Sequence, residues 1–271
     1  MTTVADALAR GQGGCPLRER EWLLAHVLGW SRTQLLTHRD YPLTAKQQHD
    51  YAALLAHLAG GEPLAYLLGR WEFWSLDLVV TRDVLIPRPE TELLVEVALA
   101  RIPVAASWDI ADLGTGSGAV ALAVASERPS CLVTAIDCSA SALAVAEANA
   151  RRLGLSNVTF LAGDWCVPLS DRRYSMILAN PPYLVADDPH LAALRYEPLL
   201  ALAAGADGLA ALRAIVSGAV RNLCPGGTLL LEHGYDQGAS VRELLVASHY
   251  EGITTLPDLE GRERVTLGVH T

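Results

Sequence analysis

The chain has very little lysine: Lys46 is the only one among 271 residues. Arginine supplies nearly all of the positive charge, and acidic residues outnumber basic ones, so the formal net charge is −9. Such a surface is a poor general binder of phosphate backbones, although it does not exclude a local arginine patch. The charge favours protein over long nucleic acid as a substrate, and we expect no direct contact with nucleic acid.

Cysteine is also scarce, and the five cysteines are scattered without a Cys-x-x-Cys pair. The eight histidines show no His-x-x-x-His spacing. These absences disfavour structural zinc and disulfide bonds. We therefore expect no bound metal, reduced thiols and a cytoplasmic location.

Long apolar runs are missing as well, because Gly, Pro or Asp interrupts each one before it reaches membrane-spanning length. The N-terminus has no basic start followed by an apolar core, and Asp6 interrupts it early. We expect an unexported monomer without membrane association. Its hydrophobic content of 51% is ample for the core of one large domain and one small one.

The pattern of apolar residues changes near residue 75. Before that point apolar residues recur at three- and four-residue steps, which predicts short amphipathic helices. The predicted helices cover residues 4–10, 17–28, 33–38 and 44–58. Ser31 and Thr44 are the predicted N-caps of two of them, and Gly29 and the Gly60-Gly61 pair are predicted stops.

After residue 70 the apolar period becomes that of strands, which predicts a β-hairpin. A helix through Ala100 then begins an alternation of strands and helices, and this alternation predicts a doubly wound α/β sheet. Its last two strands, at 252–256 and 264–269, are expected to form an antiparallel hairpin. The predicted parts are a small N-terminal helical domain (1–70), a β-hairpin linker (71–90) and a large α/β domain (91–271).

A glycine loop follows the strand predicted at 108–113. Gly114, Gly116 and Gly118 alternate just before a helix, so the backbone can approach a ligand closely and offer it free N–H groups. The loose Gly-x-Gly-x-x-Ala pattern also fits a dinucleotide site, where a pyrophosphate rests on the helix start. Asp112 favours a cationic cofactor instead, because a carboxylate is a liability beside phosphates.

A second motif, Asn180-Pro181-Pro182-Tyr183, follows the apolar run at 174–179. The prolines stiffen the turn and leave its carbonyls free as acceptors, Asn180 adds an amide oxygen, and Tyr183 adds a flat face. This combination is suited to holding a planar NH2-bearing group, such as an amide or an aromatic amine. An ordinary strand-ending turn could use the same residues.

Acidic residues follow two further predicted strands. Asp137 ends the strand at 132–137, where it can accept hydrogen bonds from ribose hydroxyls or cap the next helix. Asp164 and Trp165 follow the strand at 158–161. Because these residues, the glycine loop and Asn180 all follow strand ends, we expect the sheet to gather them at one edge.

The acidic-x-Gly-x-Gly-x-Gly form resembles motif I of class I S-adenosylmethionine-dependent methyltransferases. From about its first quarter to its end, the chain resembles one family of that class, the protein-(glutamine-N5) methyltransferases that modify peptide-chain release factors, whereas the N-terminal segment matches only in length and helical character. Segments flanking the two motifs carry the closer resemblance, at residues 63–69, 84–92, 197–209, 231–237 and 258–265. The resemblance implies the class I methyltransferase fold, S-adenosyl-L-methionine as cofactor and a class I release factor as protein partner. The helical domain would help to recognise that partner.

The implied reaction transfers a methyl group to the side-chain amide nitrogen of the glutamine in a Gly-Gly-Gln motif. Asn180 and the Pro181 carbonyl would accept the two amide hydrogens, and Tyr183 would pack on the amide. Asp164 would contact the adenine amino group and Trp165 would border the ring, although Trp165 could equally pack under the loop. The implied substrate-binding residues are Asn180, Pro181, Pro182 and Tyr183. The implied cofactor-binding residues are Asp112, Gly114, Thr115, Gly116, Ser117, Gly118, Asp137, Asp164, Trp165 and Asn180.

Several alternatives stay open at this point. An N6-adenine or N2-guanine nucleic-acid methyltransferase could use the same Asn-Pro-Pro-Tyr turn on a flipped base. An NAD-linked oxidoreductase could use the glycine loop, and a catalytically silent adaptor could bind release factors through the helical domain. The sequence also leaves undecided whether the following residues shape the pocket or only fix loops: Arg88, Glu92, Glu197 and His233.

Overall fold

The computed structural model describes residues 1–9 and 14–271. The chain forms two compact units, Met1–Arg70 and Trp71–Thr271. The end of the first predicted helix, at Arg10, lies outside the described residues. Within the described ranges, no helix is both long enough and apolar enough to cross a membrane.

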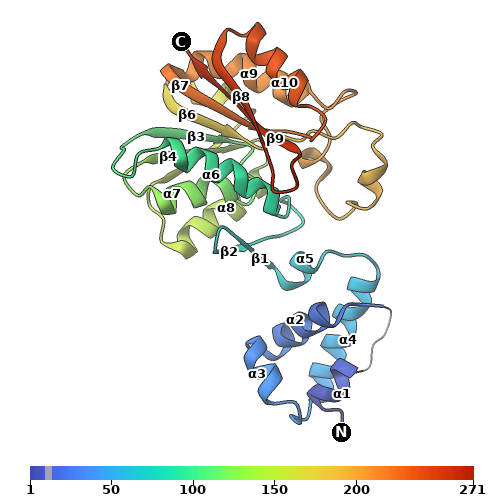
Figure 1. The fold of residues 1–271 in the computed structure, drawn as a ribbon. Helices are drawn as coiled ribbons and strands as arrows, with labels where there is room; N and C mark the ends of the chain where they lie inside the picture. The colour runs from blue at the N-terminus through green and yellow to red at the C-terminus, as the bar shows by residue number, and fades with distance from the viewer. Residues whose placement is uncertain (10–13) are drawn as a thin grey trace. The chain divides into compact units, whose positions relative to one another are not determined.

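The first unit is helical, as predicted (Figure 1). Ser31 and Thr44 each form a capping box, in which the cap side chain accepts a hydrogen bond from the backbone of a glutamine three residues on. Leu23, Leu24 and Leu35 are buried at its centre. Four helices confirm the predicted ones, and α5 is additional. The helices are α1 (Val4–Ala9), α2 (Leu17–Leu28), α3 (Arg32–Thr37), α4 (Ala45–Ala59) and α5 (Leu64–Leu68).

The second unit is the predicted doubly wound α/β sheet, with strand order β5-β4-β3-β6-β7-β9-β8. The strand β9 runs antiparallel to both of its neighbours, which confirms the predicted C-terminal hairpin. The strands of this sheet are β3 (Asp109–Leu113), β4 (Leu132–Asp137), β5 (Val158–Ala162), β6 (Tyr174–Ala179), β7 (Leu223–Glu232), β8 (Tyr250–Pro257) and β9 (Glu263–His270). The helices are α6 (Glu92–Arg101), α7 (Ala119–Glu127), α8 (Ala140–Leu153), α9 (Ala210–Asn222) and α10 (Gly238–Ala247). Short 3₁₀ helices are η1 (Pro89–Thr91), η2 (Val167–Leu169), η3 (Pro189–Ala192) and η4 (Leu199–Ala201).

The hairpin before this sheet is shorter than predicted. Its strands are β1 (Arg70–Phe73) and β2 (Leu76–Val79), and residues 80–88 contain no strand. Val84 and Ile86 are nevertheless buried. Their alternation therefore reflects the burial of a loop and not the pleat of a strand. At the hairpin turn, the Glu92 side chain accepts a hydrogen bond from the backbone nitrogen of Trp74 at 2.9 Å, so Glu92 fixes the turn.

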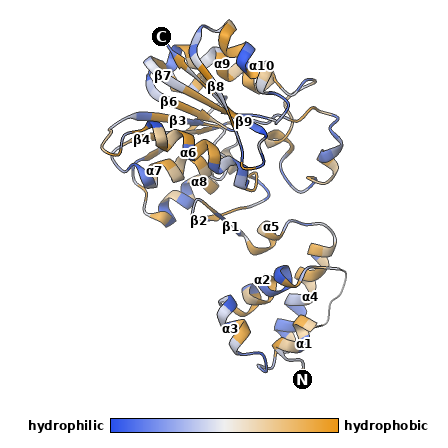
Figure 2. Cartoon of the chain, in the orientation of Figure 1, coloured by the Kyte–Doolittle hydropathy of each residue, from blue (hydrophilic) through white to orange (hydrophobic). Residues whose placement is uncertain are grey.

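Helices cover both faces of the sheet (Figure 1). The helices α6, α7 and α8 pack on one face, and α9 and α10 on the other. Along β6, Met176 and Leu178 belong to the first apolar core, whereas Ile177 and Ala179 belong to the second. Figure 2 shows the central strands mostly in hydrophobic colours, as expected for strands with two buried faces.

The parallel register aligns three strand ends at one edge of the sheet. Leu113 of β3 pairs with Ile136 of β4 on one side and with Ala179 of β6 on the other. The next residues along these strands are the glycine loop, Asp137 and Asn180. The sheet therefore brings together the motifs that lie far apart in the sequence.

One buried side chain ties the hairpin, α8 and the glycine loop together. Asn149 is fully buried on α8, and its amide nitrogen donates to the carbonyls of Val79 and Ser117 at 3.0 and 2.9 Å. Its amide oxygen accepts from the backbone nitrogen of Val79 at 2.7 Å. All three contacts bridge segments that no strand pairing connects.

We expect Asn149→Ala to lower the free energy of unfolding by about 2–4 kcal/mol, because it leaves several buried backbone groups without partners. Urea unfolding of the full chain measures this change. The matched control is Glu147→Ala on the same helix, since Glu147 forms a surface ion pair with Arg151. The control should cost less than about 0.5 kcal/mol. Equal stability of both variants would contradict the role given to Asn149.

Candidate active site

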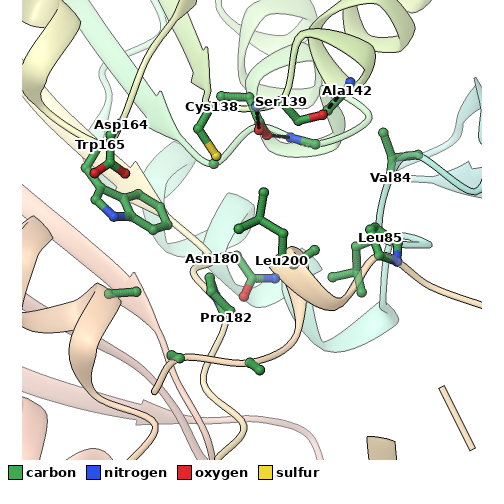
Figure 3. Close-up of a pocket in the computed structure, with 18 of the residues that line it drawn as sticks. Val84, Leu85, Cys138, Ser139, Ala142, Asp164, Trp165, Asn180, Pro182 and Leu200 are labelled. Atoms are coloured by element: carbon green, nitrogen blue, oxygen red, sulfur yellow. Dashed lines mark hydrogen bonds between the residues drawn. The ribbon is translucent and has the colours of Figure 1, made fainter. Parts of the chain in front are cut away.

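A cavity of about 410 Å³ opens at the edge where the strand ends meet. In the view of Figure 3, Asp164 and Trp165 lie on one side of it, Val84 and Leu85 lie on the other, and Asn180 lies between them. The residues predicted from sequence that line this cavity are Gly114, Gly116, Asp137, Asp164, Trp165, Asn180 and Pro182.

Asp112 does not line the cavity; it supports the glycine loop from behind. Its carboxylate is 2% exposed, and one oxygen accepts from the Thr115 hydroxyl at 2.7 Å and from the backbone nitrogen of Ala121 at 3.2 Å. Burial raises the pKa of Asp112 to about 6, against the lowering effect of these two hydrogen bonds. Any effect of Asp112 on a ligand would therefore be transmitted by the loop that it holds.

The other predicted loop residues that do not line the cavity are also buried. Thr115 is the donor to Asp112, and the carbonyl of Ser117 accepts from Asn149. Gly118 caps α7 at a φ of +85°, and a Cβ there would lie 2.9 Å from the Leu122 side chain. Only glycine fits this position without strain.

Asp137 faces the cavity and also shapes its wall. One carboxylate oxygen accepts from the backbone nitrogen of Gly116 and the other from that of Ser139, each at 2.9 Å. Ser139, and not Asp137, is the N-cap of α8, since its hydroxyl accepts from the backbone nitrogen of Ala142. An ionised carboxylate can accept up to about four hydrogen bonds. Asp137 therefore retains acceptor capacity toward the cavity.

Trp165 combines the two roles that the sequence left open. It lines the cavity, and it also packs against the core beneath α9. Its backbone has a φ of +44°, which is unusual for a bulky residue. A Cβ at Gly114 would lie 3.2 Å from the Trp165 ring, so the loop and the indole approach each other closely only because residue 114 is glycine.

The Asn-Pro-Pro-Tyr turn separates this cavity from a second, smaller one. Asn180 and Pro182 border both, whereas Pro181 and Tyr183 line only the second, which measures about 130 Å³. The Asn180 amide nitrogen donates to the Thr91 hydroxyl at 3.0 Å. Burial raises the pKa of the Tyr183 hydroxyl, which keeps the phenol protonated and neutral. A molecule in either cavity would meet Asn180.

Sequence reasoning assigned no role to the residues that hold the turn from behind. The Gln237 amide nitrogen donates to the carbonyls of Tyr183 and Gly208 at 3.1 and 3.3 Å, and its oxygen accepts from the backbone nitrogen of Gly234 at 2.9 Å. A Cβ at Gly208 would collide with the Tyr183 carbonyl. Gln237 and Gly208 lie in segments that carry the family resemblance. Membership of these segments was the sequence signal that could have pointed to their role.

Arg88 and Glu197 form an ion pair beside the second cavity. The Glu197 carboxylate is buried and also accepts from the backbone nitrogen of Ile86 at 3.1 Å. The pair ties the segment before α6 to the segment before η4. Glu197 is therefore a structural anchor, and Arg88 is both its partner and part of the cavity wall.

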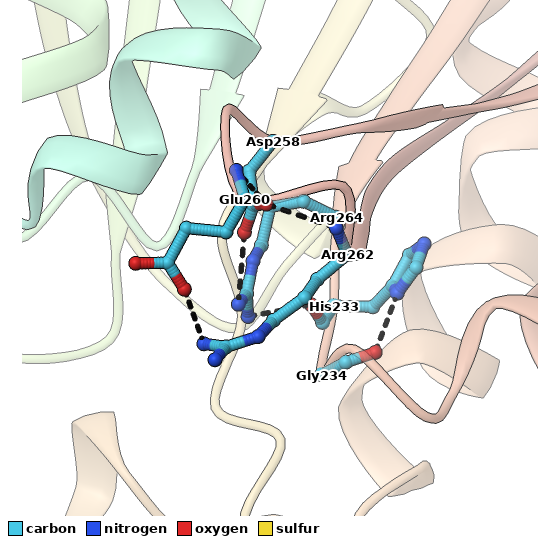
Figure 4. A network of polar contacts seen from close by, with 6 residues as sticks. All are labelled: His233, Gly234, Asp258, Glu260, Arg262 and Arg264. Carbon is cyan, nitrogen blue, oxygen red and sulfur yellow. Dashed lines mark hydrogen bonds and ion pairs between the residues drawn. The ribbon is translucent and has the colours of Figure 1, made fainter.

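His233 is a buried structural residue in the polar network of Figure 4. Its Nδ1 lies 2.8 Å from the Gly234 carbonyl and its Nε2 lies 2.7 Å from the Thr266 hydroxyl. A carbonyl can only accept, so Nδ1 carries the proton. Burial lowers the pKa of His233, which favours this neutral form. In the same network, Arg264 donates toward the His233 carbonyl and pairs with Asp258.

Two solved methyltransferase structures have a similar fold. One is a T. thermophilus 16S rRNA N2 G1207 methyltransferase in complex with AdoMet and guanosine, at 19% identity and a TM-score of 0.55. That match covers 74% of this chain and 50% of the other. A Pyrococcus furiosus methyltransferase matches at 17% identity and a TM-score of 0.54, over 80% of this chain and 98% of the other. The second unit therefore has the class I methyltransferase fold.

Curated relatives narrow this class to one family. Residues 2–69 match the PrmC N-terminal domain, and residues 89–196 match the methyltransferase small domain. A release factor glutamine methyltransferase of Xylella fastidiosa is 50% identical over 92% of both chains. Enzymes of the same name from Salmonella typhimurium and Escherichia coli are 49% and 46% identical, over 94% and 93% of this chain and 93% and 92% of theirs. The chain belongs to the release factor glutamine methyltransferases.

The cavity residues fit S-adenosyl-L-methionine. Gly116 lines the cavity, and nothing lies within 4 Å of the position that a Cβ would take, so the backbone there is open to a ligand. Asp137 and Asp164 offer carboxylate oxygens to hydroxyl, amino or cationic groups, and Trp165 offers a flat indole. In the part of the chain that the structure describes, no three His, Cys, Asp or Glu side chains form a metal site.

We expect Asp112→Asn to raise the free energy of unfolding at pH 8 by about 2–3 kcal/mol. The folded carboxyl binds its proton at a higher pH than the unfolded one, whose pKa is 3.8, so the loss of stability develops between that value and about pH 6 and is complete above it. Asparagine keeps the acceptor oxygen and removes the buried charge. The gain should shrink as the pH falls from 8 to 5, which urea unfolding at each pH would measure.

The matched control is Asp109→Asn at the more exposed start of the same strand, which should change stability by less than about 0.5 kcal/mol. If Asp112→Asn is less stable than the wild type at pH 8, the account of Asp112 as a destabilising buried charge is wrong.

Proposed function

We propose that this enzyme transfers a methyl group from S-adenosyl-L-methionine to the side-chain amide nitrogen of the glutamine in the Gly-Gly-Gln motif of class I release factors. The observation that carries the proposal is the position of Asn180. It borders both cavities, so an acceptor side chain in the smaller cavity would meet the cofactor cavity at this residue. The names of the relatives, release factor glutamine methyltransferase, support a release factor glutamine as the acceptor.

The larger cavity would hold the cofactor. Asp137 would accept hydrogen bonds from the ribose hydroxyls, Asp164 would contact the adenine amino group, and Trp165 would border the ring. The backbone of Gly114 and Gly116 would lie against the rest of the molecule. Residues behind the wall would act only through the loop, namely Asp112, Thr115, Ser117 and Gly118. When bound, the cofactor supplies a methyl group on a positively charged sulfur.

The smaller cavity would hold the glutamine. Its amide nitrogen is a weak nucleophile, because the lone pair is delocalised into the carbonyl. The Asn180 oxygen and the Pro181 carbonyl would accept the two amide hydrogens, which turns the nitrogen toward the larger cavity and favours the positive charge that develops on it. Tyr183 would pack on the planar amide. The amide nitrogen held by Asn180 and Pro181 would receive the methyl group as the carbon–sulfur bond leaves its electron pair on sulfur, and one amide proton would then pass to water.

We assign recognition of the rest of the release factor to the helical unit, Met1–Arg70. Its match to the PrmC N-terminal domain supports an assignment specific to this family. We place the enzyme in the cytoplasm as a monomer. The five cysteines are all free thiols, which agrees with a reducing compartment.

Mass spectrometry of a class I release factor incubated with the enzyme and S-adenosyl-L-methionine tests the proposal. We expect one added methyl group on the glutamine of the Gly-Gly-Gln motif. The matched control is the same release factor with that glutamine replaced by glutamate, which lacks the acceptor nitrogen and should stay unmodified. Methylation of RNA or DNA in a parallel reaction, with none on the release factor, would refute the proposed substrate.

Replacement of Asn180 by alanine tests the catalytic role of the turn. We expect Asn180→Ala to lower kcat by about 10²- to 10³-fold, because it removes one preorganised acceptor. Its affinity for S-adenosylhomocysteine, measured by calorimetry, should change little, since most of the cavity wall is intact. Unchanged kcat would remove Asn180 from the mechanism, and loss of S-adenosylhomocysteine binding would show that the residue serves the cofactor instead.

A further inference from the structure

The Asn180 side chain can serve the proposed reaction only in one orientation. Its amide oxygen accepts hydrogen bonds, whereas its amide nitrogen only donates them. The two ends of the amide have nearly the same size, so shape alone does not select one. The partner of the amide nitrogen therefore decides whether the oxygen faces the acceptor.

That partner is Thr91 in η1, from a distant part of the chain. Asn180 Nδ2 donates to Thr91 Oγ1 at 3.0 Å, and Thr91 is only 4% exposed. A threonine hydroxyl can donate one hydrogen bond and also accept. Thr91 alone would therefore tolerate either orientation of the Asn180 amide, and a further group must determine which role the hydroxyl takes.

Glu232 is in a position to be that group. It ends β7 beside β6, and because Ala179 pairs with Leu231 in parallel register, Asn180 and Glu232 are the next residues on adjacent strands. Glu232 is 1% exposed, and its Oε2 atom has no hydrogen-bond partner among the residues of the described ranges. Burial raises the pKa of Glu232 and hydrogen bonding to the Thr91 side chain lowers it, so these two side chains are within reach of each other.

We propose that Glu232 and Thr91 are positioning residues that set the orientation of the Asn180 amide. An ionised carboxylate only accepts, so the Thr91 hydroxyl gives its single hydrogen to Glu232. The Thr91 oxygen is then left to accept from Asn180 Nδ2, and Asn180 Oδ1 faces the cavities. This inference rests on the proposed function, because it assigns the direction of a hydrogen-bond chain that the glutamine would complete.

The charged and titratable groups around Glu232 come from three segments of the chain. Arg264 on β9 favours its ionisation, whereas Glu90 on η1 opposes it, and Tyr183 lies close enough to interact with it. Arg264 donates a hydrogen bond to the His233 carbonyl and forms an ion pair with Asp258 (Figure 4). Burial is the largest effect and raises the pKa of Glu232 to about 7.

A pH dependence follows with a definite sign. Below about pH 7 the Glu232 carboxyl gains a proton and can itself donate to Thr91. The Thr91 hydrogen is then free to point at Asn180, which allows the reversed amide. Turnover should therefore fall as the pH drops through this range. Replacing Glu232 by a neutral residue should abolish this fall in turnover.

The test measures kcat and KM for methyl transfer to the release factor with Thr91→Val, which keeps the shape of the side chain and removes the hydroxyl. We expect kcat to fall about 10- to 100-fold, with little change in KM for S-adenosyl-L-methionine. Thr91→Ser restores a hydroxyl and should recover most of the turnover. Thr134→Val, at a buried threonine on β4 that does not line either cavity, is the matched control and should retain wild-type kcat.

Glu232→Gln supplies a second readout, which a merely structural role would not change. It should lose the acidic fall in kcat between about pH 8 and pH 6 that we expect of the wild type. Wild-type kcat in Thr91→Val, or equal loss in the valine and serine variants, would overturn this inference and leave the proposed function intact. No transfer by the wild type to the release factor would overturn both.

Discussion

The central constraint on this molecule is the burial of both faces of its sheet. Helices cover the two faces, and residues such as Ile110, Ile177 and Leu230 are fully buried. Polar side chains that must meet a ligand can then stand only where strands end. The parallel register of β3, β4 and β6 places three such ends together. The position of the site is thus a consequence of how the core is packed. The functional residues reach the site because they come directly after the strands that end there.

The walls of the site are held by buried polar groups, and these groups oppose stability. Asp112 and Glu232 are almost inaccessible carboxyls whose pKa values burial raises to about 6 and about 7. Burying an ionisable carboxyl costs folding free energy, and strongly shifted pKa values cluster at functional sites. Each lies beside residues that line the cavities: Asp112 accepts hydrogen bonds from Thr115 and Ala121 around the glycine loop, and Glu232 follows the strand next to the one that Asn180 follows. These buried carboxyls therefore help to hold the sheet edge in place while they lower the free energy of unfolding.

Local patterns predicted much of this structure. The glycine loop, the strand that ends at Ala179 and the capped helices at Ser31 and Thr44 were found because their signals lie within a few residues. Long-range contacts were not predicted, because their partners lie far apart in the sequence: Thr91 and Asn180 are 89 residues apart, and Gln237 and Tyr183 are 54 apart. The hairpin was predicted too long because a buried loop alternates as a strand does. One usable signal was overlooked: Glu232 is an acid that directly follows three apolar residues at a strand end.

The Asn-Pro-Pro-Tyr turn by itself does not distinguish a carboxamide from the amine of a nucleobase, since both are planar NH2 groups. The fold does not distinguish them either, because an rRNA guanine methyltransferase shares it at 19% identity. The difference must come from outside the turn. A net charge of −9 disfavours phosphate backbones, and the helical unit matches a domain of the family that acts on release factors. In the proposed function, chemistry and selectivity are therefore separable: the strand ends would provide the chemistry, and the surface and the helical unit would provide the selectivity.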